Sequence, residues 1–216
     1  MLSNAQLVEI VKKGKESKER KFPESVEAIV TFKEVDPKKN DLNINETVYL
    51  PHPGSHRASV CYIGSGDLLL RAKNAGADAV LEPSQLENFA GNKREARNLA
   101  NKYDFFLDTA LMPRIGRVLG TVLGPRGKIP TPVPPNAPIE GIINRTRSAV
   151  RVRSRAALAV GAKVGDRKLS DTDLADNIQA MVQAVQRKLP NGDRNIRSII
   201  VKTSMGKPAR SKVDEA

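Results

Sequence analysis

The chain has little of several residue types that common protein classes require. It contains one cysteine, Cys61, and two histidines, so it can form no internal disulfide and falls short of a structural zinc set. It has no run of about 18 apolar residues for a membrane span, and its N-terminus has polar residues where a signal peptide needs an apolar core. We therefore expect a cytoplasmic protein with no membrane contact and no metal or redox chemistry.

Aromatic residues and activated nucleophiles are also scarce. The chain has no tryptophan, 3 tyrosines and 5 phenylalanines, which argues against a sheet that stacks unpaired bases on exposed rings. No serine, cysteine or histidine has the neighbours of an activated nucleophile. We expect no catalytic site and no cofactor, and an RNA partner would be recognised by its folded shape.

Acidic residues are missing from the central part of the chain. The 36 Lys and Arg residues exceed the 24 Asp and Glu residues and give a formal charge of +12. Residues 109–165 hold ten cations but only one acid, Glu140, so they carry +9 of this charge. Solubility does not require such an imbalance, which favours a nucleic-acid partner.

The segment 112–138 is the most unusual part of the sequence, with four glycines and seven of the 14 prolines. Gly116, Gly120 and Gly124 recur at every fourth residue. This spacing predicts a short helix whose bare face packs closely against a sheet or an RNA backbone. A proline-stiffened loop should follow and present Arg126 and Lys128 as a secondary RNA contact.

Hydrophobic periodicity predicts an α/β protein with two domains. The elements near the two ends of the chain indicate an antiparallel sheet. They are a helix near the N-terminus, strands at 25–32 and 46–51, a hairpin of 150–155 with 157–163, a helix at 170–189 and a strand at 196–203. Between them, strands alternate with helices, which is typical of a parallel sheet. The prediction is a discontinuous antiparallel α/β domain of residues 1–55 and 149–216, with an inserted three-layer Rossmann-like domain at 56–148.

An alternative function is a nucleotide-binding enzyme that uses the inserted domain. The segment IGSGDLL places Gly64 and Gly66 after a predicted strand, and Glu82 ends the next strand. However, Leu69 stands where the dinucleotide fingerprint needs its third glycine, so a structural turn is the preferred interpretation. A third possibility is an RNA chaperone that binds through charge alone.

Several segments together resemble the ribosomal protein L-one family, over essentially the whole chain. They are KFPESVEAIVTF, the PH of YLPHPG, MPRIGRVLGTVLGPRGKIPTP, LADNIQA and the terminal IIVKTSMGKPA. The length and the MPRIGR form are similar to the archaeal branch. The resemblance implies a structural protein of the large ribosomal subunit that binds ribosomal RNA at the mobile stalk, helps to release exit-site tRNA and represses translation by binding its own mRNA.

The resemblance also implies the residues that bind RNA. Its motifs match Lys21, Phe22, Ser25, Glu27, Ser198, Ser204, Met205 and Gly206 of this chain. They belong to the first and last strands of the antiparallel sheet, which we expect to be neighbours. The usual TMG is SMG here, so Ser204 keeps the hydroxyl but loses a methyl group. The free protein should be a monomer, bound to the ribosome in the cell.

Overall fold

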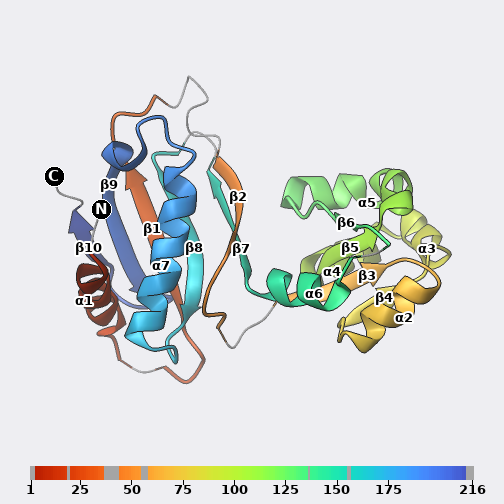
Figure 1. The fold of residues 1–216 in the computed structure, drawn as a ribbon, viewed down its shortest axis with the longest axis horizontal. Coiled ribbons are helices and arrows are strands. Elements are labelled where there is room, and N and C mark those ends of the chain that lie inside the picture. Colours follow the sequence, from red (N-terminus) through yellow and green to blue (C-terminus); the bar gives the residue numbers. More distant parts are fainter. Residues whose placement is uncertain are drawn as a thin grey trace. The chain divides into compact units, whose positions relative to one another are not determined.

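The computed structural model describes residues 3–18, 20–36, 44–54, 58–135, 137–154 and 157–212 (Figure 1). The chain forms two compact units. The first combines Met1–Arg57 with Ser148–Ala216, and the second is Ala58–Arg147. The structure is mixed α/β, with antiparallel sheets in the first unit and a parallel sheet in the second, as the periodicity predicts.

The first unit is built on a four-stranded antiparallel sheet of order β10-β9-β1-β8. Its strands are β1 (Ser25–Phe32), β8 (Ala159–Asp166), β9 (Ile196–Thr203) and β10 (Ala209–Lys212). The expected pairing of the first and last predicted strands is confirmed, since β1 lies beside β9 with Val26 opposite Thr203. The prediction missed β10, which is a short edge strand with polar side chains.

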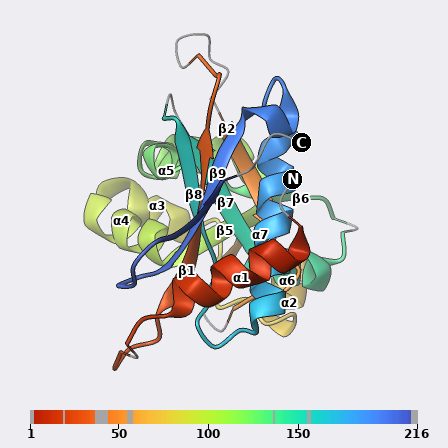
Figure 2. The ribbon, with the colours of Figure 1, turned by 90° about the vertical axis from the view of Figure 1, so that its left-hand side faces the viewer.

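Two helices bury one face of this sheet, α1 (Asn4–Lys15) and α7 (Asp171–Gln186). Ser3 and Ser170 cap their N-termini by accepting backbone N–H groups. Alternate residues of β1 point into the core beneath them, and Val26, Ala28 and Val30 are fully buried. Both helices lie on the same side of the sheet (Figures 1 and 2), so the side chains between these positions, from Ser25 to Thr31, are on the opposite face.

The predicted hairpin of 150–155 with 157–163 is wrong. Strand β7 (Ala149–Ser154) pairs with β2 (Ile44–Tyr49) in a separate two-stranded sheet, whereas β8 pairs with β1. The burial of β7 alternates as predicted, but that of β8 does not, since β8 ends in three consecutive buried residues. Alternation shows which face of a strand is buried but carries no information about its partner.

The second unit has a parallel sheet of order β4-β3-β5-β6. Its strands are β3 (Ser59–Ile63), β4 (Ala79–Leu81), β5 (Tyr103–Asp108) and the missed β6 (Thr131–Val133). Its helices are α2 (Asp67–Asn74), α3 (Gln85–Gly91), α4 (Lys93–Lys102), α5 (Met112–Arg126) and α6 (Ile139–Arg147). The described residues also form 3-10 turns, η2 (Thr109–Leu111) in this unit and η3 (Gly192–Asn195) in the first unit.

Apolar clusters lie on both faces of this parallel sheet. One cluster joins Cys61 to α3, α4 and α5, and the other joins Tyr62 to α2 and α6. Burial raises the pKa of the Cys61 thiol to about 12, so the thiol is not a poised nucleophile. Gly64 and Gly66 form the turn between β3 and α2, and Gly66 has a φ of 66° that favours glycine.

Helix α5 is longer than predicted and its glycine face is not packed. It covers 15 residues. Pro113 lies in the first turn, where it forfeits no helical hydrogen bond, whereas Pro125 lies in the last turn and forfeits one. A Cβ atom added at Gly116, Gly120 or Gly124 would meet nothing within 4 Å. The prediction that this face packs closely against a sheet is therefore wrong, and the helix buries Ile115, Leu119, Val122 and Leu123 instead.

Candidate nucleic-acid interface

Two serines join the start of β1 to the end of β9. The Ser204 N–H donates to the Ser25 carbonyl at 3.0 Å. The two hydroxyl oxygens are 2.9 Å apart, and the Ser204 Oγ also accepts from the Ser25 N–H at 3.3 Å. Both side chains are half-buried. The structure therefore brings these two predicted site residues together, although they are far apart in the chain.

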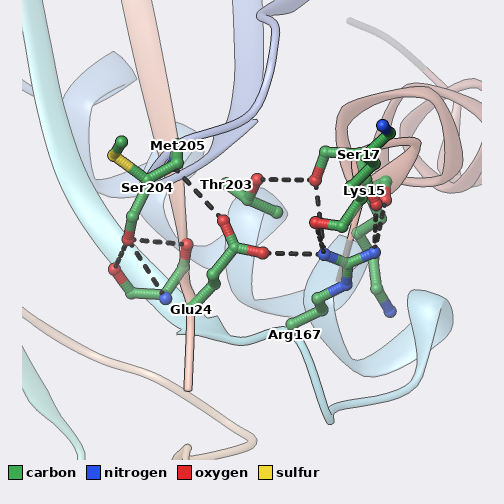
Figure 3. A network of polar contacts seen from close by, with 9 residues as sticks. Lys15, Ser17, Glu24, Arg167, Thr203, Ser204 and Met205 are labelled. Atoms are coloured by element: carbon green, nitrogen blue, oxygen red, sulfur yellow. Dashed lines mark hydrogen bonds and ion pairs between the residues drawn. The ribbon is translucent and has the colours of Figure 1, made fainter. Parts of the chain in front are cut away.

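Two apolar side chains project beside this serine pair. Phe22 is 49% exposed and Met205 is 64% exposed. The Met205 N–H donates to the Glu24 Oε1 at 3.4 Å (Figure 3). Because Phe22 precedes Glu24 by two residues, the contact ties the two loops that carry Phe22 and Met205. Lys21 is exposed in the same loop.

Glu24 and Arg167 form a polar network beneath these loops, and no role was predicted for either residue. Glu24 is 2% exposed, and its Oε2 accepts from the Arg167 guanidinium at 2.7 Å (Figure 3). The same guanidinium donates to the carbonyls of Lys15 and Ser17, at 3.3 and 2.6 Å, where α1 ends. A cation suits this helix end because the carbonyls there carry partial negative charge. In the sequence, the only sign of this network is that Glu24 directly follows the segment KFP.

Gly206 is required by the tight turn that follows Met205. Its N–H donates to the Thr203 carbonyl at 3.1 Å. A Cβ atom at this position would clash with the Thr203 Oγ1 and contact Ser17 at 3.4 Å. The Thr203 and Ser17 hydroxyls are themselves 3.2 Å apart (Figure 3). Glycine therefore lets the SMG turn close onto the end of α1.

Glu27 and Ser198 lie on the same sheet face but differ in access. Glu27 is half-buried opposite Lys202, and their charged atoms are 3.9 Å apart. Ser198 is fully buried, since its hydroxyl lies 2.7 Å from the Thr31 hydroxyl and accepts from the Arg210 Nε at 3.0 Å. It also pairs with Thr31, at the other end of β1 from Ser25. The structure therefore does not place Ser198 beside the exposed Phe22 and Met205, and the Ser198 side chain is covered.

The secondary contact residues belong to the other unit, and both make contacts there. Arg126 donates to the Asn101 Oδ1 at 2.8 Å and to the Val122 carbonyl at 3.0 Å. Lys128 donates to the Tyr103 carbonyl at 3.0 Å and lies 3.2 Å from the Asp104 carboxylate. Arg126 is exposed, whereas Lys128 is half-buried. Arg126, the last residue of α5, thus ties this helix to α4, and Lys128 ties the residues after α5 to β5.

The described residues offer neither a metal site nor a membrane-spanning helix. Within the described ranges, no group of three or more His, Cys, Asp or Glu residues could hold a metal ion. None of the helices formed by these residues combines the length and the hydropathy that a membrane crossing needs. Most of the predicted site residues of the first unit lie in or beside the loops around Phe22 and Met205.

The fold defines a two-unit α/β protein, and comparison with known proteins shows its family. The model of the Ribosomal protein L1p/L10e family matches residues 14–207. Large ribosomal subunit protein uL1 of Cenarchaeum symbiosum is 51% identical over 207 residues, which cover 95% of each chain. The uL1 proteins of Methanocorpusculum labreanum and Methanothermobacter thermautotrophicus are 42% and 41% identical, over 87% and 95% of this chain and 88% and 98% of theirs.

The chain therefore belongs to the Ribosomal protein L1p/L10e family. It is a ribosomal protein rather than an enzyme, and its relatives include archaeal proteins, as the sequence resemblance predicts. The two-glycine turn at Gly64 and Gly66 is accordingly a structural turn between β3 and α2.

Proposed function

We propose that this protein assembles into the large ribosomal subunit and binds ribosomal RNA at the mobile stalk, through the first unit. The observation that supports this proposal best is the surface around Met205 and Phe22. We call it the Phe22–Met205 patch, and it consists of Lys21, Phe22, Ser25, Ser204, Met205 and Gly206. It combines a cation, two hydroxyls and two apolar groups on neighbouring loops. Hydroxyls can bond ribose 2′-OH groups, and exposed apolar groups can contact ribose and base surfaces.

The patch is preorganised, which supports specific binding rather than attraction by charge alone. Its two loops are held by Glu24 and by the serine pair, so binding need not order them, and the entropic cost of association is lower. Glu27 lies on the adjoining sheet face, where Lys202 holds it. Ser198 would act indirectly, by holding the exposed Arg210 on that face.

The test is RNA affinity after removal of the two apolar groups. Replacement of Phe22 and Met205 together by alanine should weaken binding to large-subunit ribosomal RNA by about 1–3 kcal/mol at fixed salt. The matched control is Leu158→Ala with Leu70→Ala, which also removes two side chains that are 51% and 59% exposed. Leu158 lies at the opposite end of β1, where its carbonyl accepts from the Phe32 N–H. Equal affinity of the two double variants would contradict the site.

The domain organisation is part of the same proposal. Residues 1–55 with 149–216 act as the discontinuous RNA-binding domain, and residues 56–148 act as an inserted Rossmann-like domain. Support comes from the two compact units, whose borders lie within three residues of those positions, and from the helices on both faces of the parallel sheet. Expression of residues 58–147 alone should give a folded domain with little affinity for stalk RNA.

The inserted domain supplies the contact to exit-site tRNA in this proposal. The acid-poor end of this domain supports it, because residues 109–148 hold six cations and one acid, with Arg126 as an exposed cation. Arg126→Ala with Lys128→Ala should weaken tRNA binding and reduce its salt dependence, while stalk RNA binding changes less. An equal loss for both RNAs would show that this segment has no preference for tRNA.

Repression of the protein's own mRNA would use the Phe22–Met205 patch. A patch that reads RNA shape accepts any RNA with the same local structure. A reporter fused to the leader of the protein's own mRNA should be repressed by the wild-type chain and not by the variant with Phe22 and Met205 replaced. Equal repression by both chains would separate regulation from this patch.

A further inference from the structure

A cavity of about 490 Å³ lies directly beside the Phe22–Met205 patch. It is lined by Arg20, Lys21, Phe22, Pro23, Glu24, Arg167 and Lys168. Pockets of a few hundred Å³ hold small ligands, so the space exceeds what a single phosphate group needs. Its walls come from the loop before β1 and from the turn between β8 and α7.

Three cations in this cavity are available to a ligand. The Arg167 charge is compensated, because its guanidinium bonds the buried Glu24 carboxylate. Arg20, Lys21 and Lys168 are exposed, and none of them has an ion-pair partner among the residues that the structure describes. The cavity therefore has a neutralised floor and a positively charged rim.

The floor does not repel an anion, although it contains a carboxylate. Both Glu24 oxygens are engaged, Oε2 by Arg167 and Oε1 by the Met205 N–H, and the side chain is 1% exposed. The exposed Phe22 ring supplies an apolar wall beside the cations. Cations beside an exposed ring are the combination that binds a nucleotide, with the phosphate on the cations and the ribose or base on the ring.

We propose that one nucleotide of the bound RNA enters this cavity. Its phosphate lies between Arg20 and Lys168, and its sugar or base rests against Phe22. The inference depends on the proposed function, since it assumes that RNA covers the adjacent patch. It adds Arg20 and Lys168 to the interface, two residues that neither the sequence motifs nor the family resemblance singled out.

The first test is the salt dependence of RNA binding. Arg20→Ala with Lys168→Ala should reduce the slope of log K against log salt by about 0.7 to 0.9 for each phosphate that the protein no longer neutralises. Lys73→Ala with Arg94→Ala is the matched control, because these exposed cations belong to the other unit. Arg20→Lys with Lys168→Arg should keep the slope, because both charges remain.

The second test locates the phosphate. Neutral methylphosphonate links are placed one at a time along the ribosomal RNA fragment that the wild-type chain protects. One or two positions should weaken binding to the wild type severalfold, yet have no effect on the Arg20→Ala, Lys168→Ala variant, since the phosphate charge at those positions has no protein partner there. The same loss in both proteins at every position would overturn the proposal.

A third measurement separates a nucleotide in RNA from a free one. Adenosine monophosphate alone should bind weakly, because it lacks the contacts of the neighbouring patch. Tight binding of this free nucleotide would overturn the proposal and make the cavity a small-molecule site.

If the Phe22, Met205 variant loses affinity but the Arg20, Lys168 variant keeps the wild-type slope, the cavity proposal fails and the proposed function stands. If the Phe22, Met205 variant binds like the wild type, the proposed function fails first.

Discussion

The Arg167 guanidinium lies 2.7 Å from the Glu24 carboxylate, in a pair whose acid side chain is 1% exposed and whose basic side chain is 25% exposed. This contact joins the turn before α7 to the loop before β1. The second Glu24 oxygen then binds the Met205 N–H. One buried carboxylate thus connects three chain segments, and the exposed apolar groups of the patch depend on it for their positions.

Loss of Arg167 should destabilise the protein more than loss of an ordinary surface cation. Arg167→Met leaves the Glu24 charge buried without a partner, a change that costs about 3–5 kcal/mol in other proteins. In urea unfolding, the control Arg187→Met should stay within about 0.5 kcal/mol of the wild type, since Arg187 lies at the end of α7, away from this pair.

The second partner tests the cause of that loss. In the double variant Arg167→Met with Glu24→Gln, no buried charge is left uncompensated, so much of the stability should return. RNA binding by this double variant should still be weaker than that of the wild type, because a neutral side-chain amide holds the Met205 loop less firmly than a charged carboxylate does. If the loss of stability in the double variant equals the sum of the losses in Arg167→Met and Glu24→Gln alone, the pair is not coupled.

Two glycines in different structural settings should respond in opposite directions to alanine. Gly206→Ala should lower stability by about 1–3 kcal/mol, because the new methyl group overlaps the Thr203 side chain. Gly116→Ala should leave stability unchanged or raise it by about 0.5–1 kcal/mol, since open space surrounds that position within α5. Thermal unfolding measures both, and RNA affinity should fall only for Gly206→Ala.

Asp78 should make the second unit sensitive to acid. The Val60 N–H and, to a smaller extent, Arg147 lower the pKa of this carboxyl group below its ordinary value. The folded form therefore holds its proton less tightly than the unfolded chain does. The stabilisation is complete above the unfolded pKa, near 3.9, and is lost as the pH falls through the lowered folded value.

Asp78→Asn removes that pH dependence. At neutral pH the loss should be no more than about 1 kcal/mol, because the Asp78 side chain is 41% exposed and solvent screens its charge. The difference in unfolding temperature between wild type and variant should shrink as the solution is acidified. A difference that stays constant from neutral to strongly acidic pH would rule out the ionised carboxylate as its source.

The elements with strong periodicity could be predicted from the sequence, and those with weak periodicity could not. Strand β1 has the predicted bounds of 25–32, and α7 buries Leu174, Ile178 and Met181 as its spacing indicates. Strands β6 and β10 were missed because they are short and polar or contain proline. The partner of β7 was wrong because partners in a sheet are chosen by tertiary packing.

The sequence by itself determined the composition of the patch and the class of protein. The motifs around Phe22 and Met205 are local strings of residues, and the excess of cations is a property of the chain. Only the tertiary structure decided that Ser25 meets Ser204, that Ser198 is covered, and that Glu24 is buried against Arg167. Burial and pairing between residues more than a hundred positions apart depend on how the strands and helices pack, and no local pattern encodes that distance.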